Sequence, residues 1–214
     1  MSASDPLVLV LATANPDKAL EVREILGAAL GDRVELASRP RAVPEVEETG
    51  ETLEENARLK AAALVAATGQ ASVADDTGLE VYGLGGRPGV WSARFAGEAA
   101  TYADNVAKLL SELSGEPDGS PARRARFRTV ALCRFPDGSE LAAEGVVEGV
   151  ISVEPRGLAG FGYDPVFVAD GSAGRTFAEL SPAEKHEISH RGRAFRSLAA
   201  QLVTLLPTPS GEGA

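Results

Sequence analysis

The sequence predicts an α/β fold in which a long mixed β-sheet is flanked by helices. In the N-terminal half, short apolar runs alternate with segments of helical periodicity, as in parallel strands joined by helices. In the middle, two strand-like segments are joined by the hairpin signal Pro136-Asp137-Gly138-Ser139, which adds antiparallel strands. We therefore expect a single domain over residues 1–206, followed by a disordered Pro/Gly/Ser-rich tail over residues 207–214.

The composition limits the classes of function. Of the 214 residues, 44% are hydrophobic and 24% are charged, which is typical of a globular protein. The net charge of −10 disfavours a protein that binds nucleic acid or a membrane surface, because both partners attract a basic surface. No signal-peptide pattern and no apolar stretch of membrane-spanning length is found, and the one cysteine, Cys133, lies in an apolar run. We expect a cytoplasmic protein with a buried cysteine.

The first strand and helix enclose a turn that could bind an anion. The apolar run 7–12 predicts a buried strand, and Asn15 before Pro16 predicts the start of a helix. Backbone N–H groups and the helix dipole favour an anion at this point, and Lys18 adds a full charge. The Gly-x-x-x-x-Gly-Lys pattern of a P-loop is absent, and an ordinary strand–helix turn is the alternative. The candidate binding residues are Thr13, Ala14, Asn15, Pro16, Asp17 and Lys18.

A second strand is expected over residues 34–37, followed by a proline-rich segment and an acidic loop. Thr52 and Glu55 form a capping-box pattern, which predicts that a helix begins here and continues to about Gly69. Acidic residues before a helix are favoured by its dipole, which accounts for much of the acidic cluster. Glu47 and Glu48 lie upstream of the cap, so this explanation fits them less well.

The stretch 71–79 carries the most conspicuous acidic pair. A short apolar run predicts a buried strand that ends in a turn at Asp75-Asp76-Thr77-Gly78. In α/β proteins the ends of strands are where ligands bind, and a carboxylate pair can hold a divalent cation or activate water. A plain turn that closes the strand is the alternative, because Asp and Gly are common turn residues.

The middle of the chain is predicted to have a structural role. The glycine-rich loop 83–89 lacks the strand-to-helix context of a dinucleotide site, and residues 101–113 have helical periodicity. Four arginines begin the strand-like segment 123–135, where we expect them to form a solvated face. The chain returns as a strand over residues 140–148 and continues to 153.

Two C-terminal segments could bind a nucleobase. Phe161, Gly162, Tyr163 and Asp164 could form a flat aromatic slot with a hydrogen-bonding edge, although a core role for the two rings is the alternative. Lys185 falls in a short helix that begins with a capping box at Ser181. His190 and Arg191 open the last helix, where cations oppose the helix dipole, and this favours a ligand-binding role for them.

Taken together, these segments resemble the inosine/xanthosine triphosphate pyrophosphatase family, which acts on non-standard purine nucleotides. Six segments occur in the family's order and cover nearly the whole chain. One departure is Thr77, where many members carry serine, and the hydroxyl is kept. The matching segments are Thr13-Ala14-Asn15-Pro16-Asp17-Lys18, Glu47-Glu48-Thr49-Gly50, Ala74-Asp75-Asp76-Thr77-Gly78-Leu79, Leu84-Gly85-Gly86-Arg87-Pro88-Gly89, Phe161-Gly162-Tyr163-Asp164-Pro165 and Ser189-His190-Arg191-Gly192.

The resemblance implies two lobes around a central cleft, a homodimer, and Mg²⁺-dependent hydrolysis of ITP, dITP and XTP to the monophosphate and pyrophosphate. It implies that Glu47 and Asp76 hold the metal, with Glu48 and Asp75 as neighbours, and that Asp76 also accepts a proton from water. The remaining family positions would bind substrate. Thr13, Asn15, Lys18 and Lys60 would lie near the phosphates, Thr77 would touch the substrate, and residues 161–164 with Lys185, His190 and Arg191 would form the nucleobase pocket.

This chemistry agrees with the residues. Phosphoryl chemistry depends mainly on positioning and charge neutralisation, and Mg²⁺ takes one or two carboxylates together with phosphate oxygens. Hypoxanthine and xanthine carry a 6-oxo acceptor where adenine carries an amino donor. Arg191 or Lys185 donating to that oxygen would reject adenine by leaving a buried cation unpaired. Guanine shares the 6-oxo group, so its rejection requires a contact that penalises its 2-amino group.

Three other functions are compatible with parts of the pattern. A haloacid-dehalogenase-like phosphatase also places carboxylates after a strand, but it needs two Asp separated by one residue, whereas Asp75 and Asp76 are adjacent. A house-cleaning pyrophosphatase for other modified nucleotides would differ in its substrates. A nucleotide sensor without catalysis would bind nucleotide but would not turn it over.

Overall fold

The fold is described from a computed structural model of residues 5–206, so the tail predicted over residues 207–214 lies outside the described part. The described chain divides into two compact units that are interleaved in the sequence. The first unit comprises residues 5–75, 130–144 and 194–206, and the second comprises residues 76–129 and 145–193. Three strands and the last helix each pass from one unit to the other.

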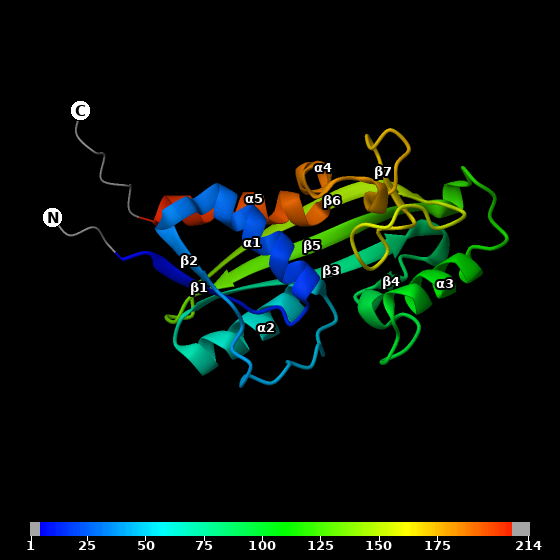
Figure 1. Ribbon diagram of the computed structural model, residues 1–214. Coiled ribbons are helices and arrows are strands. Elements are labelled where there is room, and N and C mark those ends of the chain that lie inside the picture. Colours follow the sequence, from blue (N-terminus) through cyan, green and yellow to red (C-terminus); the bar gives the residue numbers. More distant parts are fainter. Residues whose placement is uncertain (1–4, 207–214) are drawn as a thin grey trace, which may run out of the picture. The chain divides into compact units, whose positions relative to one another are not determined.

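The strands form one mixed sheet with the order β2-β1-β3-β5-β6-β7, and β4 pairs with β3 (Figure 1). β1 is parallel to both β2 and β3, whereas the β3–β4 and β6–β7 pairs are antiparallel. This arrangement confirms the predicted mixed sheet, while the central cleft stays a prediction. The strands are β1 (Leu7–Leu11), β2 (Val34–Ala37), β3 (Ala71–Val81), β4 (Pro88–Gly89), β5 (Arg124–Arg134), β6 (Glu140–Ile151) and β7 (Phe167–Ala169).

The helices after Asn15, Thr52 and Ser181 begin where the capping patterns predict. These three side chains and that of Thr101 each accept a hydrogen bond from a backbone N–H in the first turn of the helix that follows. In the described part of the chain, no helix is long and apolar enough to span a membrane. The helices are α1 (Pro16–Leu30), α2 (Leu53–Thr68), α3 (Tyr102–Glu112), α4 (Pro182–Ile188) and α5 (His190–Leu205).

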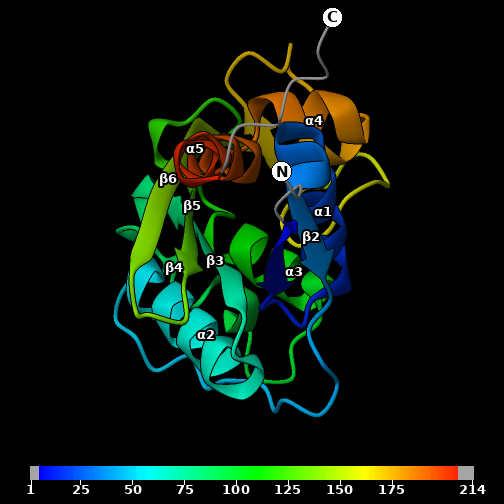
Figure 2. The same cartoon turned by 90° about the vertical axis from the view of Figure 1, so that its left-hand side faces the viewer.

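In the first unit, helices cover both faces of the parallel strands. Helix α1 and the part of α5 in this unit lie on one side of β1, and α2 lies on the other (Figures 1 and 2). Leu26 of α1 and Leu198 of α5 pack with Leu9 and Leu11 of β1 in one core cluster. The same cluster contains Cys133, which is fully buried as predicted, and burial raises the pKa of its thiol to about 12.

Two leucines that fit the helical periodicity of the sequence do not face the core. Leu20 of α1 and Leu205 of α5 are 59% and 60% exposed. The buried residues of α1 are Glu21, Val22, Ile25, Leu26 and Leu30, of which Val22, Leu26 and Leu30 repeat at the four-residue spacing of one helix face.

The turn predicted at Asp75-Asp76-Thr77-Gly78 does not exist. β3 continues without interruption from Ala71 to Val81, so these residues lie inside a strand. β3 pairs with β1 over residues 71–73 and with β4 over residues 79–80, and it is also a hydrogen-bonded neighbour of β5 in the sheet. The polar residues therefore lie between the segments that pair with β1 and β4, inside a strand of the sheet rather than at its end.

In the second unit, the arginines of β5 form ion pairs with neighbouring carboxylates. The guanidinium groups of Arg126 and Arg128 both bind the carboxylate of Glu80, at 2.7 Å and 3.0 Å, and Arg124 binds Asp170. Arg123 is an exception to the predicted solvated face, because it is only 3% exposed. It donates to four backbone carbonyls, those of Leu113, Glu116, Ile151 and Ser152.

Candidate functional site

The two adjacent carboxylates of β3 face in opposite directions. Side chains alternate across a strand, so Asp75 and Asp76 point to different faces of the sheet and cannot act as a pair on one ligand atom. Both are nearly buried, at 3% and 4% exposure. Asp75 Oδ2 lies 3.5 Å from the Lys18 ammonium. The strand geometry therefore separates their roles, with Asp75 directed to the lysine of the predicted phosphate turn.

In the predicted phosphate turn Asn15 caps α1, and three backbone amides of the turn are already occupied. The side-chain oxygen of Asn15 accepts from the N–H groups of Asp17 and Lys18, at 2.9 Å and 3.2 Å. The N–H of Asn15 in turn donates to the hydroxyl of Thr13 at 3.1 Å. Because these donors are satisfied within the turn, the Lys18 side chain is its main source of positive charge.

Lys60 joins the acidic loop to β3. Its ammonium lies 2.8 Å from a carboxylate oxygen of Glu48 and donates to the backbone carbonyl of Asp75 at 3.0 Å. The Lys60 side chain is only 12% exposed, and that of Glu48 is 27% exposed. Lys60 and Lys18 thus bring two cations to Asp75, as expected for a site that receives phosphate groups.

The carboxylates that fit a metal differ in their environments. Lysine partners engage Asp75 and Glu48, whereas Glu47 is exposed on the loop before α2. Within residues 5–206, no three His, Cys, Asp or Glu side chains form a group that could hold a metal. Mg²⁺ does not require such a group when phosphate oxygens and water complete its coordination. The exposed carboxylate of Glu47 is therefore accessible to a cation.

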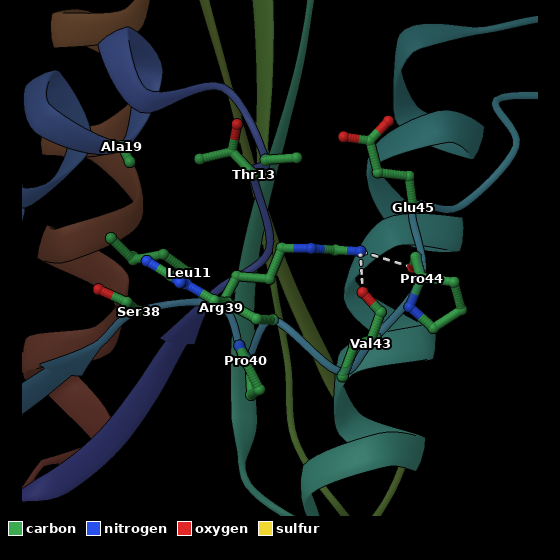
Figure 3. Close-up of a pocket in the computed structure, with 11 residues that line it drawn as sticks. Leu11, Thr13, Ala19, Ser38, Arg39, Pro40, Val43, Pro44 and Glu45 are labelled. Atoms are coloured by element: carbon green, nitrogen blue, oxygen red, sulfur yellow. Dashed lines mark hydrogen bonds between the residues drawn. The ribbon is translucent and has the colours of Figure 1, made fainter.

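A pocket of about 460 Å³ lies next to the phosphate turn in the first unit. Thr13 and Ala14 line it from the turn, and residues 38–41 and 43–45 line it from the segment after β2 (Figure 3). The Arg39 side chain extends across this pocket and binds backbone carbonyls on both sides. The role of Arg39 could not be predicted from the sequence, because hydrogen bonds to backbone carbonyls require no particular residue type at the partner position.

In the second unit, a buried ion pair connects the segment 160–164 to helix α4. The Lys185 ammonium lies 2.6 Å from Asp164 Oδ2, and both side chains are at most 5% exposed. The same carboxylate oxygen accepts from the N–H of Phe161 at 2.8 Å. A Cβ at Gly160 would lie 2.1 Å from it, and Gly160 has φ +73, so only glycine fits this position.

The ring of Phe161 is bordered by two cations and a tyrosine. The Lys185 ammonium lies 4.7 Å from the ring centroid, and the Arg191 guanidinium carbon lies 5.4 Å from it. The ring of Tyr102, the first residue of α3, is 5.9 Å away at an angle of 41°. Phe161 is half-buried and keeps an exposed part, as a stacking residue requires.

The two aromatic residues of the predicted slot have different environments. Tyr163 is 5% exposed, belongs to the core cluster of the second unit and donates its hydroxyl to the carbonyl of Ser92 at 2.9 Å. Burial raises the pKa of this hydroxyl well above its usual value. These contacts favour the alternative core role for Tyr163 and leave Phe161 as the ring suited to stacking.

His190 and Arg191 are buried at the start of α5. The His190 ring stacks on Phe127 with 4.4 Å between the centroids, and it is 3% exposed. Arg191 is 2% exposed, and its guanidinium donates to the Thr77 hydroxyl at 3.2 Å. The Thr77 hydroxyl also lies 2.7 Å from that of Thr129, so Arg191 and Thr77 belong to one polar cluster.

The comparisons with known proteins converge. Residues 9–201 match the sequence model of the Ham1 family. Over 191 residues, or 89% of its length, the chain is 50% identical to a dITP/XTP pyrophosphatase from Streptococcus thermophilus, of which it spans 58%. A dITP/XTP pyrophosphatase from Mycolicibacterium paratuberculosis is 49% identical over 92% of this chain and 96% of that protein. The solved structure of a HAM1 protein from Coxiella burnetii is 40% identical, with a TM-score of 0.82 over 92% of this chain and 99% of that one.

Proposed function

Because this chain belongs to the Ham1 family, we propose that it hydrolyses dITP, ITP and XTP to the nucleoside monophosphate and pyrophosphate. The observation that carries this proposal is the 49% identity to a dITP/XTP pyrophosphatase over 96% of that protein's length. The cations beside Asp75 and the half-buried ring of Phe161 support it, because a nucleotide needs both a charged and an aromatic surface. The role in the cell would be to remove non-standard purine nucleotides from the nucleotide pool.

The reaction breaks the bond between the α- and β-phosphates, and the leaving group carries away negative charge. Lys18 and Lys60 would bind the phosphate oxygens and offset that charge, and Asp75 and Glu48 would hold the two ammonium groups in place. Asp76 would accept a proton from the attacking water. Glu47 and Asp76 would hold Mg²⁺, which when bound supplies further positive charge at the phosphates.

The nucleobase would stack on Phe161, and its 6-oxo group would accept a hydrogen bond from Arg191. Lys185 is already paired with Asp164. It would therefore contribute to base binding indirectly, by holding the 160–164 segment in position. Adenine carries an amino donor at the same position. The Arg191 guanidinium would then face another donor and would have no acceptor for its hydrogen bond.

The proposal also concerns the oligomeric state, the cellular location and the partners of the enzyme. We propose that it acts as a homodimer in the cytoplasm on a small-molecule substrate and without nucleic acid, consistent with its net charge of −10. A house-cleaning pyrophosphatase for other modified nucleotides and a non-catalytic sensor are the alternatives.

Product analysis tests the reaction type. Purified protein is incubated with dITP and Mg²⁺, and nucleotide products are separated while pyrophosphate and orthophosphate are each quantified. The proposal requires deoxyinosine monophosphate and pyrophosphate in equal amounts. Orthophosphate as the first product would identify a phosphatase, and nucleotide binding without turnover would identify a sensor.

A further inference from the structure

We propose that Arg39 is a positioning residue that fixes the acidic loop against the phosphate turn. The proposal rests on the proposed function for the meaning of that loop, which carries Glu47 and Glu48. Between the end of β2 and the start of α2 the chain forms neither helix nor strand over residues 38–52. Ordering such a segment costs conformational entropy, so its path must be set by specific contacts.

The guanidinium of Arg39 joins three backbone carbonyls. It donates to the carbonyl of Ala12 at 3.2 Å, to that of Val43 at 2.9 Å and to that of Pro44 at 2.5 Å. Ala12 directly precedes the phosphate turn, and Pro44 lies three residues before Glu47. One side chain therefore connects the two segments, and Figure 3 shows it reaching the carbonyls of Val43 and Pro44.

The other end of the loop is held by different groups. Gly50 N–H donates to the side chain of Asn56 at 2.8 Å, and Glu51 N–H donates to Glu55 at 2.7 Å. Lys60 holds Glu48 at 2.8 Å. Glu47 thus lies between contacts to α2 on its C-terminal side and the Arg39 contacts on its N-terminal side.

A direct role in binding phosphate fits Arg39 less well. Three of the five N–H donors of a guanidinium are engaged with carbonyls here, and a planar fork with several fixed donors is suited to holding backbone in place. Arg41 provides the contrast. It lines the same pocket and is exposed, and its side chain makes no hydrogen bond or ion pair with residues 5–206.

The test compares Arg39→Ala with Arg41→Ala, which removes the same charge from the same pocket. Amide hydrogen exchange of residues 43–50 is measured without nucleotide, where the Thr49 and Gly50 amides are hydrogen-bonded and report on the loop. Because hydrogen bonds from a charged group are among the stronger ones, Arg39→Ala should speed this exchange roughly tenfold. The Mg²⁺ concentration for half-maximal pyrophosphate release from dITP should also rise roughly tenfold. Arg41→Ala should change neither.

A folded Arg39→Ala protein with wild-type exchange and wild-type Mg²⁺ dependence would overturn the proposal. If Arg39→Ala does not fold, Arg39→Lys is measured in the same way. A single ammonium cannot reproduce the fork, so intermediate values are expected, and wild-type values in both measurements would overturn the proposal. If the wild-type protein releases no pyrophosphate from any nucleotide, the proposed function fails, and the exchange rates alone decide whether Arg39 holds the loop.

Discussion

The ammonium of Lys185 and the carboxylate of Asp164 form a buried ion pair, with 2.6 Å between Nζ and Oδ2 and at most 5% of either side chain exposed. The pair is more than a neutralised charge, because Asp164 also accepts the N–H of Phe161. The charge of Lys185 therefore fixes the loop that presents the Phe161 ring. It is not an unpaired cation awaiting a nucleobase, which changes our expectation of how adenine is rejected.

We predict that Lys185→Met destabilises the protein by about 3–5 kcal/mol, because it leaves the Asp164 carboxylate buried without its cation. The double variant Lys185→Met/Asp164→Leu should lose less than the sum of the two single variants. The measurement is the free energy of unfolding from urea titrations of the four proteins. Additive losses would show that the two side chains do not stabilise each other.

Selectivity should depend on Arg191. We expect Arg191→Lys to reduce the preference for dITP over dATP, expressed as the ratio of kcat/KM values, by roughly tenfold or more. Lysine keeps the charge but not the planar set of donors, and it loses the contact with the Thr77 hydroxyl. The folded state is checked first by circular dichroism, because Arg191 is 2% exposed. An unchanged ratio in a folded variant would assign selectivity to other residues.

Asp76 is predicted to be indispensable for turnover. Asp76→Asn keeps the shape of the side chain but removes its negative charge and most of its basicity, so pyrophosphate release should fall by roughly 10²-fold or more. Asp75→Asn is the matched control, because it alters the adjacent carboxylate on the opposite face of β3. Its pairing with Lys18 predicts a rise in KM with a smaller loss of kcat. A well-folded Asp76→Asn protein with wild-type activity would remove Asp76 from the mechanism.

The acid sensitivity of the first unit should depend on Glu140. Burial raises the pKa of this carboxyl, but hydrogen bonds from Arg58 and Arg134 outweigh it, so the pKa lies below its ordinary value of 4.5. A lowered pKa in the folded state contributes stability that is complete above 4.5 and is lost as the pH falls through the folded value.

We therefore expect wild-type protein to lose stability between pH 5 and pH 3 more steeply than Glu140→Gln, as judged by the free energy of unfolding at each pH. The variant should be the less stable protein at pH 7, where Arg58 and Arg134 lose a charged partner. If the free energy of unfolding depends on pH in the same way for both proteins, ionisation of Glu140 does not cause the loss of stability in acid.

The sequence predicted the fold well wherever local chemistry decides the structure. Capping residues such as Thr52 and Ser181 accept hydrogen bonds within their own turn, so the starts of the helices could be predicted from a few neighbouring letters. The prediction failed at residues 75–78, where Asp and Gly are typical of a turn. This segment lies within β3, which is hydrogen-bonded between β1 and β5 in the sheet, and such pairing joins residues distant in the sequence.

The sequence names candidate site residues, but it does not predict their contacts. The resemblance implied that Asp164 and Lys185 belong to one pocket, but it did not indicate their ion pair, which joins a loop to a helix 21 residues later. Buried Arg123 likewise donates to carbonyls of two separate segments, 113–116 and 151–152. Such partners are set by tertiary packing, so no spacing rule reveals them.

A screen for pyrophosphate release across nucleotides decides whether the protein has the proposed activity. Purified protein is supplied with dITP, ITP, XTP, ATP, GTP and their remaining deoxy counterparts, each with Mg²⁺ and with a chelator. We predict rapid release from dITP, ITP and XTP with Mg²⁺, little from ATP or GTP, and none with the chelator. Equal turnover of ATP, or no turnover of dITP and XTP, would contradict the proposed function.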